Sequence, residues 1–147
     1  MTDLVFIDTN LLIYSLDPGE PEKRAKAAAL IKAGAQRQAL VTSPQTLSES
    51  YRILTQKRRI MPLGAVREFL SALAPTCRAP LDHATVVLAW NIEDRASYSW
   101  WDCLMLAAAL RAGCQFFATE DLSDGHLLRG MRIVNPFRSD IEALFRH

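Results

Sequence analysis

The chain has few cysteines and few histidines, and neither residue type is clustered. Its three cysteines, Cys77, Cys103 and Cys114, are odd in number and lack the paired spacing of metal ligands. Its three histidines are scattered in the same way. These features argue against both a disulfide framework and a zinc site built from His and Cys, and they are typical of a protein in a reducing cytosol. We therefore expect a cytoplasmic protein.

The sequence also lacks a long apolar run, a leader segment and low-complexity tracts. No apolar stretch approaches the ~20 residues of a membrane span, and the N-terminus has neither a basic region nor a cleavage signature. We expect no membrane contact. Half of the residues are apolar, which excludes a disordered protein. The 17 Lys and Arg nearly balance the 16 Asp and Glu, so any nucleic-acid contact must come from a local basic patch.

Apolar runs separated by helical segments predict an α/β fold. We expect strands at residues 4–8, 40–42, 116–119 and 133–134, and a short strand fits 78–80. We expect helices at residues 11–16, 21–37, 44–59, from 62 onward, 82–95, 99–113 and from about 139. This alternation predicts a three-layer α/β/α sandwich around a central, mainly parallel sheet of four to five strands. The length of 147 residues suits one domain that spans residues 1–147.

Four acidic residues occupy positions that favour a metal site. Asp8 ends the apolar run 4–7, and Asp121 follows the similar run 116–119. Glu49 lies inside a predicted helix, and Asp102 opens a later one. Ligands of open α/β sheets bind outside the carboxyl ends of the strands, where carboxylates hold hard divalent cations. The pattern therefore predicts metal-dependent phosphodiester chemistry.

Several motifs occur in a characteristic order along the chain. They are Asp8-Thr9-Asn10 after the first strand, the helix 101–109, the segment Thr119-Glu120-Asp121-Leu122 followed by Gly125, and Val134-Asn135-Pro136-Phe137. In this order the chain resembles a PIN-domain ribonuclease and, more closely, the VapC-type toxins of bacterial toxin–antitoxin pairs. The resemblance covers nearly the whole chain. It implies a PIN-like sandwich and a metal-dependent endoribonuclease that is the toxin component of a type II toxin–antitoxin pair.

The resemblance also implies roles for the four acids. Asp8 and Asp102 would be the main ligands of Mg²⁺ or Mn²⁺. Glu49 would bind the metal through water or orient the attacking water. Asp121 would complete a second, weaker metal position. All four would be catalytic residues of a reaction in which a metal-activated water attacks phosphorus.

Two of these acids, Glu49 and Asp102, also have an ordinary structural explanation. Asp102 fits a capping box that begins at Ser99. Glu49 could pair with Arg52 at i+3 spacing on a solvated helix face. Asp8 is harder to explain in this way, because an acid at the end of a buried strand is costly unless it is paired or bound to a metal. The joint placement, rather than any single residue, favours the metal site.

The fourth acid has acidic neighbours, Glu120 and Asp124. A strand alternates its faces, so Glu120 and Asp121 should not both point into the cleft. We favour Asp121, which matches the threonine–any–aspartate pattern that begins at Thr119. Asp121 could also be an ordinary turn residue before Gly125.

Other polar and aromatic residues have two open uses. The basic run 57–59 could follow an RNA backbone or could simply be a solvated helix end. Trp100 and Trp101 could stack on bases or could pack in the core or in a dimer. Three residues beside the acids are candidates for hydrogen bonds to the carboxylates: Thr9, Asn10 and Thr119.

The resemblance implies three partners: an RNA substrate, a second copy of the chain in a homodimer, and a cognate antitoxin. The chain has apolar residues beyond the obvious needs of one small core: Ala25, Ala28, Ala29, Ile31, Tyr51, Ile53, Leu54, Ile60 and Met61. Basic residues stand beside the first of these: Lys23, Arg24 and Lys26. An amphipathic antitoxin segment could lie in such a groove. These residues could instead only pack the protein's own core.

Other functional classes fit the sequence less well. Haloacid-dehalogenase-type phosphatases need a second Asp two residues after Asp8, where this chain has Asn10. Receiver domains need a paired acid and a late-strand lysine, and the chain shows neither. Flap-type DNA nucleases carry long insertions for which the chain is too short. A catalytically inactive PIN-like RNA- or protein-binding module would be expected to lose one or more of the acids, and all four are present.

Overall fold

Five short strands form one sheet in the computed structural model, which describes residues 3–145. The strands are β1 (Val5–Ile7), β2 (Leu40–Val41), β3 (Phe116–Ala118), β4 (Leu127–Leu128) and β5 (Met131–Val134). Their spatial order is β2-β1-β3-β5-β4. All neighbours pair in parallel except β4 and β5, which are antiparallel. The predicted central, mainly parallel sheet is therefore confirmed.

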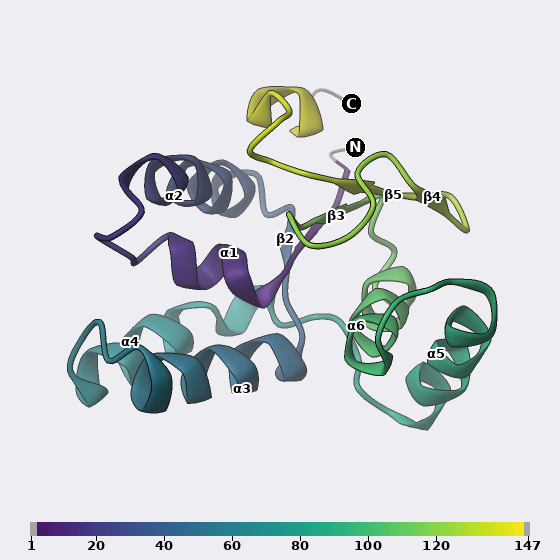
Figure 1. Ribbon diagram of the computed structural model, residues 1–147, viewed down its shortest axis with the longest axis horizontal. Helices are drawn as coiled ribbons and strands as arrows, with labels where there is room; N and C mark the ends of the chain where they lie inside the picture. The colour runs from purple at the N-terminus through teal and green to yellow at the C-terminus, as the bar shows by residue number, and fades with distance from the viewer. Residues whose placement is uncertain (1–2, 146–147) are drawn as a thin grey trace.

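Helices cover both faces of this sheet (Figure 1). One face carries α1 (Thr9–Tyr14), α2 (Pro21–Gln36) and a C-terminal 3-10 turn (Ile141–Phe145), and the other carries α5 (His83–Arg95) and α6 (Trp100–Arg111). The strands supply alternate residues to the two layers. Phe6 and Phe117 stack on the α6 side with ring centroids 5.0 Å apart, while Val5 and Ile7 lie in the opposite cluster. The predicted three-layer α/β/α sandwich is confirmed.

A second helical unit packs against α1. It comprises α3 (Pro44–Arg52), a π-helical turn (Ile53–Lys57), α4 (Leu63–Ala72) and a 3-10 turn (Ala74–Thr76). The first three of these elements share a small apolar cluster with α1, centred on Ile13, Leu54 and Val66. Leu54 is fully buried there, and most of the other apolar residues that we expected in an antitoxin groove from this region pack around it. This unit forms one wall of the site described below.

The structure corrects the sequence prediction at three places. The strand expected at 78–80 is absent: a single bridge joins Thr42 to Cys77, and the pairing stops because Pro80 has no N–H to donate. The helix expected at 44–59 changes to π geometry at Ile53. The helix expected from 139 is a five-residue 3-10 turn, too short for a stable α-helical nucleus.

Strand β4 has no counterpart in the sequence prediction. It forms a hairpin with β5 through Arg129 and Gly130, whose φ angles are 49° and 88°. Positive φ at both positions is the geometry of the tight turns that suit a hairpin. The pair Arg-Gly lacks the Asn-Gly or Asp-Gly signal by which such a turn is usually recognised.

None of the helices among residues 3–145 is long and apolar enough to cross a membrane.

Candidate active site

The sheet brings Asp8 and the segment before Asp121 to the same edge. Strands β1 and β3 are parallel neighbours with Ile7 opposite Ala118, so the residues that follow them emerge side by side. The Asp8 N–H donates to the Ala118 carbonyl at 3.1 Å. In the order β2-β1-β3 the next strand in sequence lies on one side of β1 and the later strand β3 lies on the other, so the strand order reverses beside β1. Ligands of open α/β sheets bind at such a switch point. Asp8 therefore lies where a substrate is expected.

Asp8 is a buried carboxylate, with only 9% of its surface exposed. It caps α1 by accepting from the Thr9 N–H at 2.6 Å, and its other oxygen accepts from Thr119 Oγ1 at 2.7 Å. Burial raises the pKa of Asp8 to about 6, although the two hydrogen bonds oppose the rise. The charges of Asp121 and Asp102 raise it further, which places these two acids in the same electrostatic neighbourhood.

Glu49 projects from α3 toward the start of α1. Its Oε2 accepts from Thr9 Oγ1 at 3.0 Å, and its Oε1 accepts from Gln45 Nε2 at 3.1 Å. Within residues 3–145 no ion pair joins Glu49 to Arg52, so the ordinary explanation of Glu49 as half of an i+3 pair is wrong. The hydroxyl of Thr9 and its N–H thus connect Glu49 to Asp8 through one residue.

Asp102 caps α6, and its charge also acts on Asp8. Its N–H donates to Ser99 Oγ at 3.2 Å, and its Oδ2 accepts from the same hydroxyl at 2.8 Å, so it does help to cap α6. Its charge nevertheless contributes to the raised pKa of Asp8. Capping and membership of the acidic site are compatible, because the cap uses one carboxylate oxygen.

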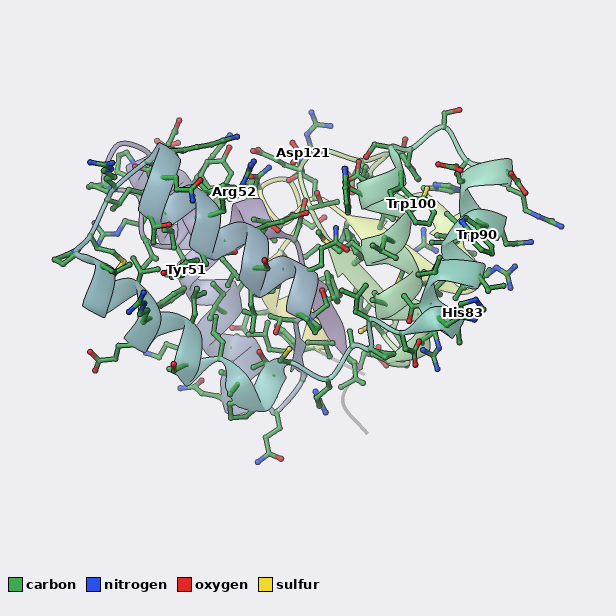
Figure 2. All side chains as sticks on the ribbon, turned by 90° about the horizontal axis from the view of Figure 1, so that it is seen from below. Tyr51, Arg52, His83, Trp90, Trp100 and Asp121 are labelled. Carbon is green, nitrogen blue, oxygen red and sulfur yellow. The ribbon has the colours of Figure 1, made fainter. Side chains whose placement is uncertain are left out.

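Asp121 belongs to the same network. Its N–H donates to Thr119 Oγ1 at 3.1 Å, and its Oδ2 accepts from Asn10 Nδ2 at 2.6 Å. Figure 2 shows Asp121 from below, in that view between the helix that carries Arg52 and the helix that begins at Trp100. Asp121 is exposed, whereas Asp8 is buried.

The two acids that neighbour Asp121 are engaged elsewhere. Glu120 accepts from the Tyr14 hydroxyl and from Lys23 Nζ, the latter at 2.9 Å. Asp124 accepts from the Asn135 N–H at 2.9 Å, at the end of β5. Glu120 and Asp121 thus have different partners, although both lie in the bend after β3 and not in the strand whose alternating faces we expected to separate them.

The acids of this site lack basic partners. None of the ion pairs among the described residues includes one of the four: Asp8, Glu49, Asp102 and Asp121. The described residues also hold no group of three or more His, Cys, Asp or Glu that converges as a ligand set. The four carboxylates suit a cation that bonds directly to only one or two of them and keeps several waters. Mg²⁺ binds to proteins in this way.

Comparison with known proteins identifies the fold family. The PIN domain profile matches residues 5–123, a span that contains all four acids and the first three strands. This chain belongs to the PIN domain family. The family resemblance inferred from the sequence motifs is thereby confirmed.

A solved structure extends this result. VapC20 of Mycobacterium tuberculosis, a sarcin–ricin loop cleaving toxin, is 20% identical to this PIN domain and superposes with a TM-score of 0.58. The match covers 77% of this chain and 86% of VapC20. At this identity the likeness shows that the two share a fold. Among curated proteins, no sequence matches this PIN domain.

Two features of this PIN domain were not found from the sequence. Gln45 Nε2 donates to Glu49 and, at 3.0 Å, to the Trp101 carbonyl, which ties α3 to α6. Its position four residues before Glu49 was a usable signal, because side chains at i and i+4 meet on a helix. Within the basic run 57–59, Arg58 forms an ion pair with the buried Asp17, so that residue has a structural role.

Proposed function

We propose that this PIN domain is a metal-dependent endoribonuclease and the toxin component of a type II toxin–antitoxin pair. Membership of the PIN family supports nuclease activity. The observation that carries the proposal is the environment of Asp8: a buried carboxylate at the switch point of the sheet, near the charges of Asp102 and Asp121, with no cation beside it among the described residues. Such a group is stabilised when a divalent cation binds.

Asp8 and Asp102 would hold Mg²⁺ or Mn²⁺, and Asp121 would contribute to a second, weaker position. When bound, the metal supplies Lewis-acid polarisation of the phosphate and lowers the pKa of a water molecule. The fit rests on the donor set, since oxygen ligands suit these hard cations and the neighbouring side chains are acidic or neutral.

Glu49 has the geometry of a proton acceptor. Thr9 and Gln45 each donate one hydrogen bond to its carboxylate, so its orientation is fixed while lone pairs on both oxygens stay available. We assign to Glu49 Oε1 or Oε2 the proton of the attacking water. Attack by water on phosphorus with departure of the 3′ oxygen leaves 5′-phosphate and 3′-hydroxyl ends. Attack by the ribose hydroxyl, with departure of the 5′ oxygen, would instead leave a 2′,3′-cyclic phosphate.

The proposed partners are RNA, a cognate antitoxin and a second copy of the chain. VapC20, with the same fold, is a sarcin–ricin loop cleaving toxin, which makes structured RNA the first substrate to test. On α2 the small side chains of Ala25, Ala28 and Ala29 are exposed, and we expect an antitoxin segment to pack on this face. We expect expression of the chain alone to stop growth and co-expression of a small partner encoded by an adjacent gene to restore it. We also expect a cytoplasmic homodimer.

Cleavage of total RNA by wild type and by Asp8→Asn tests the nuclease proposal. With Mg²⁺ or Mn²⁺ the wild type should produce fragments with 5′-phosphate ends, and chelation by EDTA should prevent this. Asp8→Asn should be inactive and folded. Sequencing of RNA 5′ ends after induced expression then identifies the substrate.

A matched control is Asp94→Asn, which removes one charge from an exposed position of α5 and should cleave like the wild type. Unchanged cleavage by Asp8→Asn would remove the central claim. RNA or protein binding without cleavage, by a wild type that takes up metal, would favour a catalytically inactive PIN-like binding module.

A further inference from the structure

A concave surface adjoins the acidic site between α3 and α6. This α3–α6 groove has a volume of about 700 Å³ and is lined by Pro44, Gln45, Ser48, Glu49, Arg52, Ile53, Leu81, Trp101 and Leu104. The volume lies within the roughly 300–1,000 Å³ of small-ligand sites. Glu49 lines the groove with its side chain and also accepts from Thr9, beside Asp8. The groove is thus continuous with the proposed cleavage centre.

One wall of the groove carries an exposed aromatic ring, and the opposite wall carries an exposed guanidinium group. Trp101 is 62% exposed, the largest exposed fraction among the large apolar side chains that are described. Arg52 is exposed on the opposite wall and takes part in none of the ion pairs of residues 3–145. Aromatic faces stack on unpaired bases, and guanidinium groups contact phosphate. This is the lining expected where a single strand of nucleic acid binds.

The groove has a fixed relation to the acids. Gln45 Nε2 donates to Glu49 and to the Trp101 carbonyl at 3.0 Å, so one amide holds both walls. Asp102 follows Trp101 on α6, which places a groove residue directly beside a proposed metal ligand. If the scissile phosphate of an RNA strand lies at the four acids, the neighbouring nucleotide would therefore reach the groove.

We propose that the α3–α6 groove binds one unstacked nucleobase of single-stranded RNA next to the scissile phosphate, with Trp101 as the stacking platform and Arg52 as the contact to the adjacent phosphate. This inference rests on the proposed ribonuclease function and names a determinant of its substrate. Trp100, in contrast, is partly buried and packs against the core cluster that contains α6.

The test measures binding without cleavage. We would measure the Kd by fluorescence anisotropy with labelled ten-nucleotide oligoadenosine and oligouridine in EDTA. Each variant below is made in the Asp8→Asn protein, which serves as the parent. Trp101→Ala should weaken binding roughly 5- to 150-fold, the range of base–aromatic stacking. Trp101→Phe should bind within a few-fold of the parent. Trp90→Ala is the matched control, since Trp90 is 51% exposed but does not line the groove.

Abasic substitutions locate the base. Replacing one nucleotide at a time should reveal one position at which the parent loses affinity, and the Trp101→Ala variant should show no further loss there, because the two changes remove the same contact. Arg52→Gln should weaken binding and reduce the salt dependence by about one phosphate contact.

Two results would overturn the inference. One is that the Trp101→Ala variant binds RNA as tightly as its parent. The other is that each abasic substitution lowers the affinity of the parent and of the Trp101→Ala variant equally. A Trp101→Ala variant that binds RNA normally but no longer co-purifies with the adjacent-gene partner would assign the groove to a protein instead. Cleavage by the wild type with metal is scored separately. Trp101-dependent binding without any cleavage would support the groove and overturn the nuclease proposal.

Discussion

Thr119 Oγ1 donates a 2.7 Å hydrogen bond to Asp8 Oδ2, although 111 residues separate the two in sequence. The same hydroxyl accepts the Asp121 N–H at 3.1 Å. One buried side chain therefore fixes the orientation of the innermost acid and the start of the loop that carries the outermost one. Thr119 is 1% exposed, so its hydroxyl has no solvent to replace either partner.

Thr119→Val should impair the site through Asp8. The hydrogen bond from Thr119 lowers the pKa of Asp8, so its removal should raise that pKa further above about 6. We expect the acidic limb of the cleavage–pH profile to move to higher pH, and the free energy of unfolding to fall by about 1–3 kcal/mol. Thr119→Ser keeps the hydroxyl and should keep the profile. An acidic limb at the same pH in the Val and Ser variants would contradict this role.

The stability of the metal-free protein should depend on pH through Asp8. Its carboxyl has a pKa of about 6 in the folded protein against an ordinary value of 3.8. The folded state therefore binds this proton more tightly, and the resulting stability is fully present below pH 3.8 and lost as the pH rises through 6. The free energy of unfolding falls by about 3 kcal/mol, because each unit of difference between these two pKa values corresponds to about 1.36 kcal/mol.

Asp8→Asn isolates this effect. In EDTA at pH 7.5 the variant should unfold at higher urea concentration than the wild type, and the difference should shrink toward pH 4. Added Mg²⁺ should raise the Tm of the wild type more than that of the variant. Parallel stability curves for the two proteins between pH 4 and 7.5 would show that the Asp8 carboxylate is not destabilised by burial.

Lys23 should act on the site through Glu120. Lys23 Nζ and the Tyr14 hydroxyl hold the Glu120 carboxylate away from its neighbour Asp121. Lys23→Met should release a second carboxylate beside the metal position and lower the cleavage rate roughly tenfold, the scale of supporting contacts at metal sites. The Mg²⁺ concentration for half-maximal rate should change while KM for RNA stays constant.

Lys32→Met provides the control, because Lys32 is exposed on the same helix. Equal Mg²⁺ dependence in the two variants would mean that the ion pair of Lys23 with Glu120 only stabilises the fold.

Replacement of a glycine by alanine should have different effects on stability at Gly34 and at Gly64. A Cβ at Gly34 would lie 3.0 Å from Leu40 Cδ1 and 3.2 Å from Leu40 Cβ, where α2 packs on β2, whereas a Cβ at Gly64 would meet nothing within 4 Å. Overpacking costs about 1–3 kcal/mol, and alanine recovers up to ~1 kcal/mol of helix propensity. Urea unfolding should show Gly34→Ala less stable by about 1 kcal/mol and Gly64→Ala neutral or more stable. Equal effects would contradict the close approach of α2 to the sheet.

The sequence was informative where local patterns determine structure. Asp8 could be located because an apolar run ends at it, and Ser99 because its hydroxyl precedes a helical pattern by one residue. The contacts that orient the acids could not be read in this way. Gln45 meets Trp101 across 56 residues, and Lys23 meets Glu120 across 97, so only the packed layers bring them together. The β4–β5 hairpin and the π-helical turn were missed because tertiary packing overrides weak local signals there.

The pairing of β1 with β3 also determines when the acidic edge can exist. A ribosome adds about 5–20 residues per second, so roughly 6–20 s of translation separate the synthesis of Asp8 from that of its partner Thr119. Until then the nascent chain contains β1 and β2 but lacks the strand that completes the edge. The proposed RNA-cleaving activity depends on that edge, so it would be withheld from the ribosome until β3 has been made. Products truncated before β3 would then be inactive.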